Sequence, residues 1–173
     1  MSSNDDDILI QNYLSGDDRA FDDLYQRYRR RLFSWLVKCV QDRRLAEELF
    51  QETFLRIIRF LPQYKPQEKF SHLLFRVAHR LVLDAVRKNK KDRGVLSLMD
   101  VTEPAAKSES QGLEEAIQRI PKEQRAVIFL SEYAGFTFSE IARITGCSIN
   151  TALGRMRYGL LNLRKILKEW EAI

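Results

Sequence analysis

The fold of this chain is decided by residues 137–168, TFSEIARITGCSINTALGRMRYGLLNLRKILK. The first four of these residues match a capping box, which opens a short helix that we expect to end at Thr145. Gly146 then makes a turn, and Ser148 can cap a long final helix that reaches about Trp170. A short helix, a glycine-containing turn and a longer helix are typical of a helix-turn-helix, whose second helix enters the major groove of DNA.

Apolar residues recur along the long helix at helical spacing, which predicts one buried stripe. The stripe consists of Ile149, Leu153, Met156, Leu160, Leu163 and Leu167. The opposite face carries Asn150, Thr151, Gly154, Arg155 and Tyr158 near the start of the helix. In a major groove, Arg155 could bind a guanine edge and Asn150 an adenine. Phosphates could be bound by three arginines, Arg143, Arg157 and Arg164. The alternative to a DNA-binding motif is an ordinary helical hairpin, whose arginines form a solvated face.

The rest of the chain has the same helical periodicity, so we expect an all-α protein made of two small helical domains. Three periodic segments occupy residues 17–40, 42–62 and 70–91, after a frayed or short leading helix in the first eleven residues. Asp17 or Asp18 could cap the first of these segments, and Asp42 starts the second. Residues 92–111 break the pattern and have the composition of a flexible linker. Two more helices, 113–120 and 121–133, precede the helix-turn-helix. The expected domains are therefore 1–91 and 112–173.

Charge is distributed unevenly over the 173 residues, whose net charge is +5. Residues 76–93 contain seven basic and two acidic residues, and residues 141–168 contain six basic residues and no acid. Two separate contacts with a polyanion are indicated. The sequence shows no apolar run long enough for a membrane helix and no secretion signal, so we expect a cytoplasmic protein without membrane insertion. Cys39 and Cys147 read as buried reduced thiols, and no metal site or other cofactor is indicated.

The helix over residues 42–62 has a broad apolar arc and an acidic exposed face. The exposed positions include Glu48, Gln51, Glu52 and Leu55. Because an acidic face repels DNA, we expect this helix to contact a protein, with a merely solvated face as the alternative. A catalytic role for the carboxylates of Glu48 and Glu52 is rejected, because no metal ligand set, phosphate-binding loop or activated nucleophile accompanies them. The chain is therefore not expected to be an enzyme.

The helix over residues 70–91 carries a basic line opposite its apolar stripe. That line consists of His72, Arg76, His79, Arg80, Leu83, Arg87 and Lys90. It could follow a nucleic-acid backbone, although solvated basic faces are also common. His72 and His79 have no third metal ligand nearby, so we interpret them as surface histidines.

Taken together, these segments resemble a bacterial RNA polymerase sigma factor of the extracytoplasmic-function type, which has only the second and fourth conserved regions. Residues 16–36, GDDRAFDDLYQRYRRRLFSWL, resemble the opening helix of that family, and residues 45–57, LAEELFQETFLRI, its polymerase-binding segment. Residues 70–88, FSHLLFRVAHRLVLDAVRK, are similar to its promoter-melting and minus-ten segment. Residues 117–167 are similar to its minus-thirty-five reader.

The resemblance implies a transcription initiation factor that binds core RNA polymerase and directs it to specific promoters. The implied polymerase-binding residues are Glu48, Gln51, Glu52 and Leu55. The opened minus-ten strand would be held by the loop Gln63–Gln67 and the following helix, through Tyr64, Arg76, His79, Arg80, Arg87 and Lys88. The minus-thirty-five duplex would be bound by Arg143, Ser148, Asn150, Thr151, Arg155, Arg157 and Tyr158. An anti-sigma factor is a further partner that the resemblance allows.

Two other classes of function remain open at this point. A dimeric helix-turn-helix regulator would bind duplex DNA without polymerase, whereas a sigma factor needs polymerase for strong binding. A nucleic-acid enzyme would require a metal or nucleophile constellation that the residues do not offer.

Overall fold

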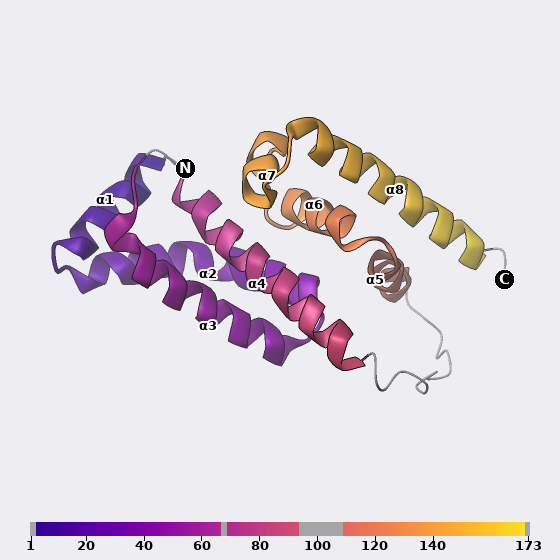
Figure 1. Ribbon diagram of the computed structural model, residues 1–173, viewed down its shortest axis with the longest axis horizontal. Helices are drawn as coiled ribbons and strands as arrows, with labels where there is room; N and C mark the ends of the chain where they lie inside the picture. Colours follow the sequence, from indigo (N-terminus) through magenta and orange to yellow (C-terminus); the bar gives the residue numbers. More distant parts are fainter. Residues whose placement is uncertain (1–2, 67–68, 94–108, 172–173) are drawn as a thin grey trace. The chain divides into compact units, whose positions relative to one another are not determined.

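The computed structural model describes residues 3–66, 69–93 and 109–171, and every regular element in these residues is a helix (Figure 1). The first half contains α1 (Ser3–Leu14), α2 (Asp18–Val40), α3 (Arg43–Phe60), the 3-10 helix η1 (Leu61–Gln63) and α4 (Phe70–Arg93). The second half contains α5 (Glu109–Arg119), α6 (Lys122–Glu132), α7 (Phe138–Thr145) and α8 (Ile149–Glu171). The all-α expectation is confirmed.

The chain divides into two compact units. One contains the residues up to Val86, and the other contains most of the residues from Arg87 onward. The expected linker, residues 92–111, is helical at both ends, because α4 continues to Arg93 and α5 begins at Glu109. The rest of that expectation concerns residues 94–108, which lie outside the described residues.

Local capping explains where the first helices begin. Asp17 accepts a hydrogen bond from the backbone N–H of Arg19, and Asp42 accepts from Arg44 and Leu45. These carboxylates satisfy amides that have no partner within the helix, as the sequence predicted. Between the two helices, Gln41 adopts a left-handed conformation with φ of 53°, which ends α2 and lets α3 start at once.

The leading helix α1 is a full element of twelve residues, longer than the frayed or short helix that we expected. Ile10 is fully buried, and α1 packs against α2 and η1. A helix that buries apolar side chains against two neighbours is stabilised by packing rather than by its own propensity. The acidic N-terminus is therefore part of the fold of the first unit.

The core of the first unit is built around α2. Leu32, Trp35 and Leu36 have no exposed surface. The ring of Trp35 lies 5.6 Å from that of Phe75 on α4, measured between centroids, in an edge-to-face arrangement. On the other side, α3 packs against α2, where an aromatic cluster joins Tyr25, Phe33, Phe50 and Phe54. The first unit is thus a helical bundle with α2 as its central helix.

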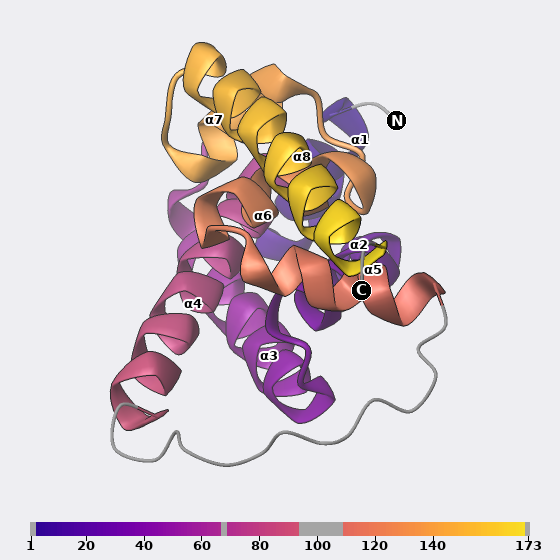
Figure 2. The same ribbon diagram turned by 90° about the vertical axis from the view of Figure 1, so that its right-hand side faces the viewer.

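In the second unit, α6 and α8 run side by side, and α5 crosses the C-terminal part of α8 (Figures 1 and 2). The crossing is fixed by the guanidinium of Arg119, which lies 5.0 Å from the centre of the Trp170 ring. Gly135, with φ of 65°, ends the turn after α6 in the left-handed conformation that glycine favours. α6 begins at Lys122, one residue later than predicted, and Pro121 occupies the N-cap position before it.

Cys39 is buried as expected, whereas Cys147 is only half-buried. In the described ranges, no helix combines the length and the apolar character needed to cross a membrane.

Candidate functional site

The first candidate surface is the acidic face of α3, defined as Glu48, Gln51, Glu52 and Leu55. The opposite side of α3 buries Ala46, Leu49, Phe54 and Ile57, as the apolar arc predicted. Glu48 and Gln51 are exposed, Glu52 is half-buried, and 49% of Leu55 is exposed. Leu55 thus places an apolar side chain within a ring of polar groups, the arrangement of core and rim that protein-binding surfaces have.

Both carboxylates of the acidic face have partners on the same helix. The Arg44 Nε atom lies 3.5 Å from Glu48 Oε1, and Arg56 Nε lies 2.7 Å from Glu52 Oε1. These pairs are spaced four residues apart and exposed, so each contributes at most a few tenths of a kcal/mol. A protein partner could therefore replace them at little energetic cost.

The second candidate surface begins at the segment after α3. Tyr64 ends η1, and its backbone N–H donates to the carbonyl of Leu61. Its side chain is half-buried, and its hydroxyl donates to Oδ1 of Asp7 on α1, 2.9 Å away. The ring centroid of Tyr64 lies 6.4 Å from that of Phe70, so the ring also lies close to the start of α4.

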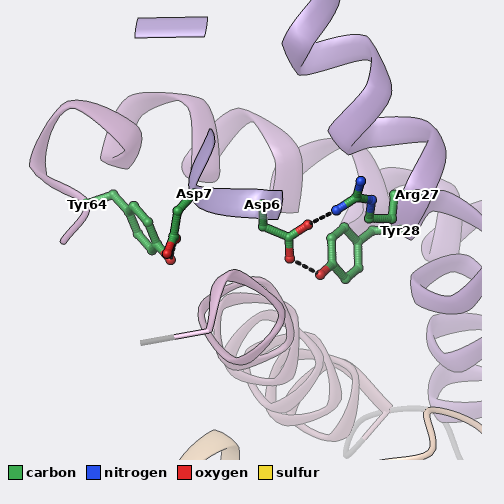
Figure 3. A network of polar contacts seen from close by, with 5 residues as sticks. All are labelled: Asp6, Asp7, Arg27, Tyr28 and Tyr64. Atoms are coloured by element: carbon green, nitrogen blue, oxygen red, sulfur yellow. Dashed lines mark hydrogen bonds and ion pairs between the residues drawn. The ribbon is translucent and has the colours of Figure 1, made fainter. Parts of the chain in front are cut away.

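Figure 3 shows that this bond belongs to a larger polar network between α1 and its neighbours. Asp6 is only 5% exposed and accepts hydrogen bonds from the hydroxyl of Tyr28 and from the guanidinium of Arg27. Burial raises the pKa of Tyr28 well above its usual range, and the hydrogen bond to Asp6 raises it further. Burial and the bond to Asp7 act on the pKa of Tyr64 in the same direction. No sequence pattern indicated this network, because its hydrogen-bonded pairs are 21 to 57 residues apart.

The second surface continues along α4. Arg80, Arg87 and Lys88 are exposed, and Arg76 is half-buried. The side chain of Lys90 lies outside the described residues. Among the described side chains of the basic line, Arg80 and Arg87 thus remain exposed, and Lys88 is an exposed cation next to Arg87.

The interpretation of His72 and His79 as surface residues is wrong. Their exposed fractions are 1% and 7%, and the ring of His79 lies 6.5 Å from that of Trp35. All residues from Phe70 to Phe75 are buried, so the first turn and a half of α4 has no solvated side. Periodicity assigns one buried stripe to a helix and therefore misses a segment that is enclosed all round.

The third candidate surface is the helix-turn-helix. Thr137 and Glu140 form the predicted capping box: the Thr137 N–H donates to Glu140 Oε2 at 3.0 Å, and the Glu140 N–H to Thr137 Oγ1 at 3.4 Å. Gly146 has φ of 69°, and the Oγ of Ser148 accepts from the backbone N–H of Thr151 at 3.0 Å. The start of each helix is therefore fixed by a side chain.

The candidate DNA-binding side chains of this motif are mostly on the surface. Exposed are Arg143, Ser148, Asn150, Thr151, Arg157 and Tyr158, whereas Arg155 is half-buried. Ser148 and Thr151 also cap α8, with their hydroxyl oxygens 2.8 Å apart. Asn150 and Arg157 are seven residues apart, so they share one face of the helix.

The predicted buried stripe of α8 is partly wrong. Leu163 is buried and Met156 and Leu167 are half-buried, but Ile149, Leu153 and Leu160 are exposed. The buried face instead contains Ala152 and Gly159.

The reason for this shift is a close approach between α8 and α6. A Cβ at Gly159 would lie 2.9 Å from Ile128 Cδ1 and 3.3 Å from Gln124 Cβ. One turn further, the amide of Asn162 donates to Gln124 Oε1 at 2.9 Å. Small residues let the helices pack closely and turn the larger leucines outward. A pattern that ranks positions by apolar size cannot find such a contact.

The chain is similar to known sigma factors over most of its length. Residues 24–92 match the family Sigma-70 region 2, and residues 110–156 match Sigma-70, region 4. The chain is 30% identical over 169 residues to the RNA polymerase sigma factor CarQ of Myxococcus xanthus, covering 94% of this chain and 97% of CarQ. It is 28% identical over 178 residues to the ECF RNA polymerase sigma factor SigK of Mycobacterium bovis, covering 95% of each chain.

Among solved structures, the fold is similar to that of the sigma factor RpoE from Bartonella quintana, solved in complex with the anti-sigma factor NepR. The TM-score is 0.68 at 22% sequence identity, and the match covers 84% of this chain and 97% of RpoE. The helical architecture thus has a counterpart of nearly the same extent.

Proposed function

The chain belongs to the extracytoplasmic-function sigma factors of RNA polymerase, and from this premise we propose how its surfaces divide the work of initiation. A sigma factor binds the core polymerase and directs it to specific promoters. Sigma factors are not a class of enzyme, and in our proposal this chain acts by binding alone. The first unit, expected over residues 1–91, binds polymerase and the minus-ten element, and the second, expected over 112–173, binds the minus-thirty-five element.

The acidic face of α3 is the proposed polymerase-binding site. The observation that carries this assignment is the exposure of Leu55 beside Glu48 and Gln51 on a helix whose other side is fully packed. A negative surface is repelled by the promoter, so a protein is the suitable partner. Leu55 supplies apolar area, and the carboxylates supply complementarity to a basic partner surface.

The minus-ten strand is assigned to the segment at Tyr64 and to the cations of α4. Arg80, Arg87 and Lys88 are exposed and suited to bind the phosphates of a single strand, with Arg76 at the edge. Tyr64, whose ring lies close to Phe70 at the start of α4, is an aromatic side chain on which an unpaired base can stack. We assign no nucleotide contact to His79, because its imidazole is buried against Trp35.

The minus-thirty-five duplex is assigned to α7 and the first turns of α8. The N-terminal end of α8 presents Asn150 for a base edge. Arg157, which was expected to bind phosphate, is exposed, whereas Arg155, which was expected to bind a guanine edge, is half-buried. We therefore assign the guanine edge to Arg157 and keep Arg143 for phosphate. Ser148 and Thr151 keep their capping role, and their exposed hydroxyls can bind the DNA backbone. Arg155 and Tyr158 lie at the border of this surface. An anti-sigma factor, the class of partner present in the RpoE complex, would have to compete for these same surfaces.

The decisive experiment reverses the charge of the acidic face. The double variant Glu48→Lys/Glu52→Lys should lose retention by immobilised core polymerase and lose run-off transcription, because the basic partner surface is then repelled. Asp22→Lys/Asp23→Lys is the matched control, since both aspartates are exposed on α2 of the same unit and the charge change is equal. If the Glu48/Glu52 variant docks and initiates like the control, the assignment is wrong.

A further inference from the structure

Leu153 is an apolar side chain at the centre of the polar surface that starts α8. It was expected in the buried stripe, yet 43% of it is exposed. Asn150 precedes it by three residues and Arg157 follows it by four, so the three side chains are neighbours on one face of the helix. Both flanking residues are exposed and carry hydrogen-bonding groups.

Gly154, the next residue, leaves this face open. A Cβ at Gly154 would meet no atom within 4 Å in the described part of the chain. The backbone of α8 is therefore unobstructed beside Leu153, and a ligand can come close to it. A glycine in the interior of a helix is destabilising relative to alanine by about 0.5–1 kcal/mol, so close approach is a reason for its presence.

The major groove of DNA offers one apolar group among its hydrogen-bonding edges, the C5 methyl of thymine. An apolar side chain flanked by an amide and a guanidinium has the composition needed to bind such a group between two polar base edges. Single exposed apolar residues are common on proteins, so exposure alone would not decide the question. Here the position of Leu153 between two candidate base-reading residues decides it.

We propose that Leu153 is a specificity-determining residue that packs against a thymine methyl group in the minus-thirty-five duplex, between the base pairs bound by Asn150 and Arg157. This inference rests on the proposed function, because α8 must lie in the major groove for the contact to form. It adds an apolar requirement to a site whose other residues bind through hydrogen bonds and charge.

A second explanation for the exposed leucine is a protein-binding seam along α8. Ile149 and Leu160 are also exposed, by 48% and 53%, and Leu160 follows Leu153 by seven residues on nearly the same side. At 1.5 Å per residue, Leu160 lies about 10 Å further along the helix axis, away from the end that enters the groove. Leu160 therefore serves as the matched control: a seam would use both leucines, whereas a thymine contact uses Leu153.

The test uses the full-length chain bound to core polymerase and a promoter selected from a pool randomised over the minus-thirty-five element. Each thymine of the selected element is replaced in turn by deoxyuridine, which removes only the methyl group. At one position the substitution should lower promoter affinity about fourfold, because one methyl group is no longer buried against the protein. Leu153→Ala should cause a similar loss on the thymine promoter and abolish the difference between thymine and uracil. Leu160→Ala should keep that difference.

The inference is overturned if no thymine responds to the replacement, or if the response persists in Leu153→Ala, while randomising the whole element still abolishes initiation. It is also overturned if both alanine variants weaken polymerase binding equally and neither changes the response to uracil, which would identify a protein seam. If the sequence of the element has no effect at all, the proposed role of α8 fails, and the inference fails with it. Because Leu153 is on the surface, unchanged thermal unfolding of Leu153→Ala verifies that the fold is intact.

Discussion

The hydroxyl of Tyr64 donates a hydrogen bond to Asp7 over 2.9 Å and thereby joins the segment after α3 to the first helix of the chain. The adjacent Asp6 binds Tyr28 and Arg27 of α2 (Figure 3). Two consecutive aspartates thus connect α1 to two different parts of the first unit. The segment assigned to the minus-ten strand is held in place by a helix that itself carries none of the assigned DNA contacts.

Replacing Asp6 with alanine should destabilise the first unit. The substitution leaves the buried hydroxyl of Tyr28 without its acceptor and Arg27 without its counter-ion, a change that typically destabilises by about 1–3 kcal/mol. Chemical denaturation of the free protein measures the effect. Asp5→Ala is the control, since Asp5 is an exposed aspartate of the same helix. Equal stability of the two variants would show that the network contributes nothing to folding.

Alkaline pH should weaken the fold through Tyr28 and Tyr64. Their pKa values are raised in the folded protein, whereas a phenol in the unfolded chain ionises near its ordinary pKa of about 10. Above that pH the unfolded state binds fewer protons than the folded state, so the free energy of unfolding falls as pH rises. Below it the contribution is fully present.

Urea denaturation between pH 8 and 11, with phenolate absorbance recorded in parallel, checks this prediction. Because lysines also titrate in this range, the informative quantity is the difference between the wild-type chain and Tyr28→Phe. The variant should be less stable at pH 8 but lose less stability per pH unit above 10. Parallel curves for the two proteins would contradict it.

Sequence reasoning succeeded where the physical cause is local. Asp17 and Asp42 cap their helices through amides two or three residues away, and the Thr137–Glu140 box spans four residues. Each of these contacts depends only on nearby residues and on preferences that short polar side chains have in any protein. The order and bounds of the helices could therefore be predicted closely.

The reasoning failed where the cause is a tertiary contact. The face that α8 buries depends on how closely Gly159 approaches Ile128, 31 residues away in sequence, and the burial of His79 depends on Trp35. The bond from Tyr64 to Asp7 likewise joins residues that no periodicity relates. The helices that carry the candidate residues could be predicted, but which of their side chains are exposed and which are buried needed the packed structure.

Leu55→Ala should weaken binding to core polymerase without weakening the fold. Because 49% of this side chain is exposed, its removal creates no cavity, whereas loss of a central apolar contact typically lowers affinity by about tenfold. Equilibrium binding to core polymerase and thermal unfolding of the free chain measure the two effects. Phe60→Ala is a suitable control, since Phe60 is 42% exposed on α3 but lies away from the acidic face. Comparable losses for both variants would mean that apolar area in general, and not the acidic face, determines affinity.

Alanine at two glycines of the same helix should have opposite effects on stability. At Gly159 the new methyl would lie 2.9 Å from Ile128 Cδ1, so α6 and α8 must separate or Ile128 must change its rotamer, an overpacking that destabilises by about 1–3 kcal/mol. At Gly154 the new methyl would meet no atom within 4 Å among the described residues, and the lower entropy of the unfolded chain stabilises by about 0.5–1 kcal/mol.

Urea denaturation of the free protein, followed by circular dichroism, compares these two variants with the wild-type chain. The pair controls for helix propensity, because each substitution makes the same gain within one helix and only the tertiary surroundings differ. A destabilised Gly159→Ala beside a stabilised Gly154→Ala would locate the contact between α6 and α8 at Gly159, and hence fix which face of α8 is left for DNA. If both variants gain stability, α8 does not approach α6 at Gly159. The side chain of Leu153 would then be expected to be buried, as its apolar character first indicated.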